Sequence, residues 1–208
     1  MNTLLRHLFT AATLSAALLT PDMASAQDKV PREGMTYVGI LATGLNHRSV
    51  GQNTLETAWS TTGSMVLGTH ISEYFHVEIR AGAGTTTAEI DNELELDIEY
   101  FASWYIGGHY PITDYANAYA QFGFSHVQGV ATLTPLGKAR EADPDDDSPY
   151  ASIADEYPDS SFSVSWLLGL DFEVIDNGFI VLEGGRLFED TETGANTFQF
   201  STGFKYEF

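Results

Sequence analysis

The sequence predicts an all-β fold, an eight-stranded antiparallel up-and-down transmembrane β-barrel, and three observations carry this prediction. The last twelve residues, 197–208, alternate strictly between an aromatic face and a polar or small face, as side chains on a half-buried strand do. Seven earlier segments alternate in a similar way, and about ten residues is the length at which a tilted strand crosses a bilayer. The connections between these segments alternate between long and short, which predicts loops on one rim and tight turns on the other.

The closing segment shows the pattern most clearly. Its two faces are Phe198, Phe200, Thr202, Phe204, Tyr206 and Phe208 against Gln199, Ser201, Gly203, Lys205 and Glu207. A terminal strand with an aromatic side is poorly suited to water, because chain ends fray and expose that side. We therefore expect the aromatic face to meet lipid and the polar face to line the lumen.

The N-terminal residues have the pattern of a cleavable secretory signal. Arg6 and His7 precede an apolar run over residues 8–19, and the small-residue site Ala24-Ser25-Ala26 follows. A retained membrane anchor is the alternative, but the apolar run is shorter than the ~20 residues that such a helix needs. The predicted organisation is a signal peptide over 1–26, a periplasmic lead-in over 27–33 and the barrel over 34–208.

Composition excludes several classes of function. The chain has 208 residues and no cysteine, so disulfides, thiolate metal sites and cysteine nucleophiles are absent. Its net charge is −20, from 29 acids against 9 bases. Nucleic-acid binding depends on basic surface, and we predict no nucleic-acid partner. No apolar run after the N-terminus is long enough for a membrane helix, so a membrane would be crossed by strands.

The eight predicted strands are separated by turns and loops at regular intervals. The fourth has the longest alternation, and its acids Glu95, Asp97 and Glu99 are predicted to face the lumen. Connections after the second, fourth and sixth strands are short, and Asn177-Gly178 is a hairpin signal. Lipid tolerates no unpaired strand edge, so the first and eighth strands should pair, with both termini on the short-turn, periplasmic side. The strands are predicted over residues 35–44, 60–70, 74–83, 94–107, 118–132, 161–173, 179–188 and 197–208.

Several motifs resemble the OmpA-type outer-membrane β-barrel domain, in the small stand-alone form of OmpX-like, porin-like proteins. The resemblance covers essentially the whole mature chain. In the seventh strand, Glu183 is followed by Gly184-Gly185-Arg186, a departure that displaces an arginine and predicts a bulge. The motifs are Tyr37-Val38-Gly39, Leu67-Gly68, Trp104-Tyr105-Ile106-Gly107-Gly108-His109-Tyr110, Tyr119-Ala120-Gln121-Phe122-Gly123 and Leu168-Gly169-Leu170-Asp171-Phe172.

The resemblance implies a location and partners but says little about activity. It implies the cell outer membrane of a Gram-negative bacterium, contact with outer-membrane lipid and lipopolysaccharide, and insertion by the barrel-assembly machinery. Phe204, Tyr206 and Phe208 resemble the terminal signal that this machinery recognises. No cofactor and no catalytic residue are implied.

Polar residues on the inward face predict a plugged lumen. An eight-stranded barrel is only wide enough for side chains to fill it, and charges inside it must pair or be hydrated. A narrow, cation-preferring pore is the alternative, because acids outnumber bases in the inward set. The predicted structural network consists of His76, Glu78, Arg80, Glu99, Gln121, Asp171, Glu183 and Lys205.

Two further features of the sequence are candidate functional sites. His126 lies where lipid A-modifying barrels carry a catalytic histidine, but Gln128 stands where the nucleophilic serine would be, so no triad forms. In the acidic loop 141–159, Asp143, Asp145 and Asp147 have the first spacings of a calcium loop, but its glycine and closing glutamate are missing. We expect a rim histidine and a solvated acidic loop, with divalent-cation binding at the loop as the alternative.

The preferred function is a non-catalytic outer-membrane protein with a structural or surface-interaction role through its acidic extracellular loops. A narrow pore is the second hypothesis, and a lipid A-modifying enzyme is the third. A soluble carrier of the lipocalin kind would need an apolar interior and a polar exterior, the reverse of the pattern in the closing strand.

Overall fold

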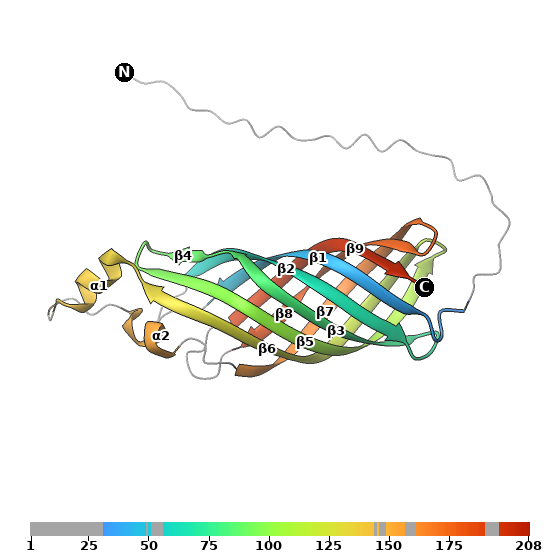
Figure 1. Cartoon of the computed structure of the whole chain (residues 1–208), viewed down its shortest axis with the longest axis horizontal. Coiled ribbons are helices and arrows are strands. Elements are labelled where there is room, and N and C mark those ends of the chain that lie inside the picture. The colour runs from blue at the N-terminus through green and yellow to red at the C-terminus, as the bar shows by residue number, and fades with distance from the viewer. Residues whose placement is uncertain are drawn as a thin grey trace, which may run out of the picture. The chain divides into compact units, whose positions relative to one another are not determined.

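Eight long antiparallel strands close into a barrel in the computed structural model (Figure 1). The structure describes residues 31–48, 50, 56–143, 145, 149–156, 161–189 and 196–208. The predicted signal peptide lies outside these residues. The barrel strands are β1 (Thr36–Arg48), β2 (Thr57–His70), β3 (Phe75–Thr86), β5 (Leu94–Thr113), β6 (Ala116–Leu133), β7 (Ser161–Ile175), β8 (Gly178–Glu189) and β9 (Asn196–Glu207).

The barrel closes where the sequence predicts, between its first and last strands. β1 pairs with β9 along its whole length. Beyond this ladder, Thr36 N donates to Phe208 O at 3.0 Å and Phe208 N donates to Thr36 O at 2.8 Å. Because every barrel strand has two neighbours, no strand edge is left open to lipid.

Short and long connections alternate around the barrel, so its two ends differ. Residues 71–74, 114–115 and 176–177 make tight turns at what we call the short-turn end. The predicted hairpin turn is present with Asp176 and Asn177 at its centre, and Asn177 has a φ of +61°, a left-handed conformation that asparagine tolerates in turns. The opposite, long-loop end carries the short strand β4 (Ala88–Ile90) and the helices α1 (Pro135–Glu141) and α2 (Ala151–Glu156), grouped at the left of Figure 1. Among the described residues, no helix has the length and apolar character to cross a membrane.

The prediction that the acidic residues at the start of β5 face the lumen is wrong. Leu94, Leu96 and Ile98 are buried in the lumen, whereas Glu95, Asp97 and Glu99 are exposed on the outside. The register of the β5–β6 pair shifts between Ile98 and Tyr100, and an extra residue in one strand exchanges the faces of all residues beyond it. The bulge predicted near Arg186 lies one position later, between Arg186 and Phe188 in the β8–β9 pair.

The outer surface carries an apolar band between two groups of exposed aromatic residues. Along β5, Tyr110 near the short-turn end follows Tyr100 by ten positions, and both are exposed. At ~3.3 Å per residue and a tilt of ~45°, ten residues rise about 23 Å, close to the ~25 Å height of the lipid-facing band in outer-membrane barrels. The exposed acids of β5 lie beyond Tyr100, so the wall there faces water. The flanking aromatics are Tyr74, Phe75, Tyr110, Tyr115, Tyr206 and Phe208 at the short-turn end, and Trp59, Tyr100, Phe162 and Phe200 at the other boundary.

Candidate functional site: the barrel lumen

Arg80 of β3 lies at the centre of a polar network that crosses the lumen. Its guanidinium pairs with Glu78 on the same strand and with Glu183 on β8. Its Nη2 also donates to Glu183 Oε2 and to Gln121 Oε1 of β6, both at 3.0 Å. All four side chains are buried. One cation therefore joins carboxylates from two walls of the barrel, as a buried charge requires.

Two tyrosines complete the coordination of these carboxylates. Tyr37 Oη donates to Glu78 Oε2 at 2.8 Å, and Tyr119 Oη donates to Glu183 Oε2 at 2.7 Å. Each ring lies over a glycine of the adjacent strand: a Cβ at Gly68 would come within 2.2 Å of the Tyr37 ring, and one at Gly169 within 2.2 Å of Tyr119. Both positions need glycine because the rings occupy the space of a side chain.

A second group of charges lies toward the short-turn end. Asp171 accepts from Lys205 Nζ at 2.7 Å and from Asn117 Nδ2 at 2.5 Å. Glu207 pairs with Arg32 and lies 3.2 Å from His70 Nε2. Across both groups, three cations face four carboxylates, an excess of one negative charge: Arg32, Arg80 and Lys205 against Glu78, Asp171, Glu183 and Glu207.

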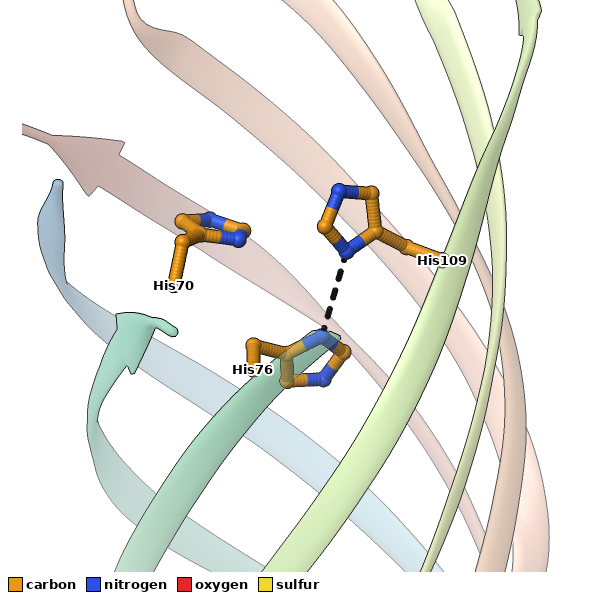
Figure 2. Close-up of side chains that lie close together, drawn as sticks. All are labelled: His70, His76 and His109. Carbon is orange, nitrogen blue, oxygen red and sulfur yellow. Dashed lines mark hydrogen bonds between the residues drawn. The ribbon is translucent and has the colours of Figure 1, made fainter. Parts of the chain in front are cut away.

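Three buried histidines meet beside this second group (Figure 2). His70 ends β2, His76 lies near the start of β3, and His109 lies near the end of β5. His70 and His76 are cross-strand partners, and His76 pairs with Gly107, two positions from His109. His76 Nδ1 is 3.4 Å from His109 Nδ1. One ring nitrogen from each residue lies within 4.8 Å of the others.

The other half of the lumen, toward the long loops, is mainly apolar, although it also contains a buried polar group in which the ring nitrogens of His47 lie 2.8 Å from Ser60 Oγ and 3.1 Å from Thr197 Oγ1. Between the two halves lies a layer of hydroxyl groups, in which Tyr105 Oη lies 2.6 Å from Ser165 Oγ. Beyond it, Tyr150 and Ile153 from the β6–β7 connection pack onto the inward residues of the strands. Burial and a hydrogen bond to Asp91 raise the pKa of Tyr150, so its hydroxyl stays a neutral donor. The apolar cluster consists of Leu45, Val50, Ala58, Ala88, Ile90, Leu94, Leu96, Ile98, Phe101, Val127, Ala131, Leu133, Tyr150, Ile153, Leu187 and Phe188.

The space left in the polar half is small. A cavity of about 20 Å³ is lined by the histidines, the two tyrosines and the charged groups described above. A volume of roughly 10–15 Å³ holds one water molecule, so the cavity accommodates about one. This cavity therefore offers an individual hydration site.

The structure brings together most of the predicted lumen residues. Glu99 is the exception: the bulge in β5 places it on the outside. Sequence reasoning missed Tyr37, His70 and His109 as members, although the turn at residues 71–74 makes His70 and His76 neighbours. The predicted residues found in the lumen are His76, Glu78, Arg80, Gln121, Asp171, Glu183 and Lys205.

The two other sequence candidates are placed differently. His126 faces outward between the rings of Tyr100 and Phe162, at centroid distances of 6.2 and 5.1 Å. In the loop 141–159, Asp147 and several other acids lie outside the described residues. Within the described part, residues 135–141 and 151–156 form short helices rather than an irregular loop.

Comparison with known proteins assigns the family. A family model described as outer membrane protein beta-barrel domain matches residues 10–208. The chain belongs to this family. The resemblance inferred from the sequence is thereby confirmed at the level of the family, and the outer membrane is the location of this barrel. No curated protein sequence matches it.

Solved structures of small outer-membrane barrels are similar in fold. Ail of Yersinia pestis is 13% identical, with a TM-score of 0.51, over 85% of this chain and 99% of that chain. Neisserial surface protein A is 14% identical, with a TM-score of 0.53, over 85% and 100%. OprG from Pseudomonas aeruginosa is 10% identical, with a TM-score of 0.51, over 85% and 97%. At these identities the similarity shows the fold and says nothing of activity.

Proposed function

We propose that this protein is a non-catalytic, non-conducting barrel that presents its long loops at the cell surface. The observation that supports the proposal is that two sets of side chains fill the described lumen, the network around Arg80 and the apolar cluster. A lumen filled with side chains leaves the loops and the lipid-facing wall as the surfaces available to partners. Lipopolysaccharide and outer-membrane lipid are the partners that this surface meets first.

Planar-bilayer recording separates this function from a narrow cation pore. Purified, folded protein should give no unitary conductance in potassium chloride at any applied voltage. A family member known to conduct, inserted in the same bilayers, is the control for insertion. Cation-selective steps from this protein would overturn the proposal and establish the pore.

The orientation is part of the proposal: the short turns and both chain termini lie in the periplasm, and the long loops lie outside. The alternation of loop lengths supports it. The cysteine-free sequence makes it testable with single substitutions and an impermeant thiol reagent on whole cells. Leu136→Cys in α1 should be labelled, and Ser72→Cys in the first tight turn should be labelled only after the outer membrane is opened. The reverse pattern would contradict the orientation.

An enzyme acting on lipid A is the remaining alternative. His126, the one histidine weighed for that role, has the aromatic rings of Tyr100 and Phe162 as neighbours. General-base catalysis needs a nucleophile within hydrogen-bond reach of the histidine. Deletion and overexpression should therefore leave the mass spectrum of lipid A unchanged, and a change in its acyl chains would contradict the proposal.

Divalent-cation binding by the acidic loop 141–159 stays a prediction. If the loop bridges to lipopolysaccharide through calcium, chelation should weaken binding of the protein to lipopolysaccharide, and Asp143→Asn with Asp145→Asn should reduce the effect.

A further inference from the structure

We propose that His70, His76 and His109 form a binding site for a divalent transition-metal ion of the zinc class, at the short-turn end of the lumen. Neutral imidazole is a preferred ligand of zinc, copper and nickel. Three histidines with a water molecule in the fourth position make an open tetrahedral zinc site. The three residues come from three successive barrel strands, β2, β3 and β5 (Figure 2).

The spacing of the ring nitrogens fits one metal ion. With metal–nitrogen bonds of ~2.0–2.1 Å, two ligands of a tetrahedral ion lie about 3.3–3.4 Å apart. His76 Nδ1 and His109 Nδ1 lie 3.4 Å apart. The third nitrogen is within 4.8 Å of both, so a small rotation of His70 brings it into range.

A buried ring nitrogen without a partner is the second, independent observation. The atom concerned is His70 Nδ1, which no described side chain hydrogen-bonds and which is shielded from solvent. A buried polar atom left without a partner costs ~1–3 kcal/mol, so a native structure normally satisfies it. A metal ion satisfies His70 Nδ1 directly. The small cavity lined by all three histidines gives the ion its space.

The surroundings of His70 match those of a metal ligand. Its Nε2 lies 3.2 Å from Glu207 Oε1, and a carboxylate that accepts from one ring nitrogen leaves the lone pair of the other free for a metal.

One rearrangement accompanies binding. Gln121 Nε2 donates to His76 Nε2 at 2.8 Å, while Gln121 Oε1 accepts from Arg80. These partners assign the ring proton of His76 to Nδ1. When a metal binds at Nδ1, the proton is displaced to Nε2, and the Gln121 amide must turn its oxygen toward the ring and give up its bond to Arg80.

Zinc titration of the full protein tests the site. The protein is purified from outer membranes in detergent without a polyhistidine tag, and Zn²⁺ binding is measured by competition with a chromophoric chelator. We expect one Zn²⁺ per chain. His109→Gln and His70→Gln should each weaken binding at least tenfold, whereas the matched control His126→Gln, an outward-facing histidine, should leave it unchanged. Glu207→Gln should weaken it by about 10- to 100-fold, as removal of an outer-shell partner does.

Two further readouts keep the test independent of any one variant. Co²⁺ should give the intense visible absorption of a four-coordinate nitrogen site in the unmodified protein. Zn²⁺ should raise the thermal midpoint of unfolding of the unmodified protein, because a ligand that binds only the folded state stabilises it. Circular dichroism confirms that each variant is folded. Absence of saturable binding at micromolar Zn²⁺, or equal binding by folded His70→Gln and His109→Gln variants, would overturn the proposal.

Discussion

At the residue scale, Arg80 decides the arrangement of the polar half of the lumen. It is the cation that Glu78 and Glu183 share, and its guanidinium also lies 5.2 Å from the Tyr105 ring centroid. Hydrogen bonds to charged groups in a low-dielectric interior are strong, but the loss of one partner exposes the full desolvation cost of the others. The network is therefore sensitive to single deletions.

Replacement of Arg80 tests this sensitivity. Arg80→Met leaves two buried carboxylates without their cation, and we expect a loss of about 3–5 kcal/mol in the free energy of unfolding. Urea unfolding of the barrel in lipid vesicles measures it. Glu189→Gln removes the more exposed ion pair with Arg186 and should cost no more than ~1 kcal/mol. Equal effects of the two variants would show that Arg80 is not a structural centre.

Gly68 and Gly63, both on β2, make a matched pair. A Cβ at Gly68 would lie 2.2 Å from the Tyr37 ring, whereas one at Gly63 meets nothing within 4 Å. Gly68→Ala should displace Tyr37 from Glu78 and cost about 1–3 kcal/mol, as overpacking does. Gly63→Ala should be close to neutral in the same urea titration. A neutral Gly68→Ala would mean that the ring moves without loss of its hydrogen bond.

At the scale of one element, β5 shows how much the sequence could predict. Its existence and antiparallel neighbours follow from the alternation that starts at Leu94, but the strand runs to Thr113, beyond the predicted end at residue 107. The bulge does not, because apolar residues continue at even positions on both sides of Glu99. Electrostatics carried the missing signal: the odd positions are acidic up to Glu99 and uncharged from Phe101 onward. A narrow lumen could not have held three further carboxylates without cations to match.

The histidine cluster could not be predicted from the sequence for a different reason. His70 and His76 become neighbours through one tight turn, which is local information. His109 joins them only through the register of β3 against β5, and strand register depends on the whole closed barrel. The charged network was easier to predict, because inward-facing charges in a narrow lumen must find one another.

Deletion of Glu99 tests the role of the bulge. Without the extra residue, Leu94, Leu96 and Ile98 would turn outward, and Glu95 and Asp97 would enter the apolar cluster. We expect the deletion to prevent refolding in detergent, whereas Glu99→Gln, which keeps the bulge, should refold as the unmodified protein does. Circular dichroism and the gel mobility of folded barrels measure both. Refolding of the deletion variant would show that the barrel tolerates either set of alternate residues of β5 facing the lumen.

The terminal strand β9 is predicted to act in assembly as well as in closure. Phe208→Ser should leave refolding in detergent unchanged, because Phe208 is exposed and the closing bonds use its backbone. In cells it should lower the amount of folded protein in the outer membrane, if this residue is part of the assembly signal. Phe162→Ser, at an equally exposed aromatic on β7, is the control that should assemble normally. Equal losses would point to lipid contact rather than to a signal.

At the scale of the whole molecule, one part of the barrel wall has the pattern of a lipid-facing surface and another part has the pattern of a water-facing surface. Within the apolar band, the wall is apolar outside and polar inside, as lipid demands. Beyond Tyr100, β5 is acidic outside and apolar inside, as in a water-soluble protein. The bulge at Glu99 lies at this boundary, and it switches which alternate residues of the strand face inward. The long-loop end thus has an apolar core of its own, which we propose as a second seal of the lumen.

The two seals predict how the barrel could be opened. Removal of the polar seal, by Glu78→Ala, Arg80→Ala and Glu183→Ala together, should not produce conductance, because the apolar cluster still excludes water. Phe101→Ala with Phe188→Ala should also be silent, because the polar network remains. Only the combination of all five substitutions should give unitary steps in planar bilayers, provided that circular dichroism shows a folded barrel. Conductance from the first variant alone would mean that the apolar cluster is not a seal, and the surface role would then rest on the polar network by itself.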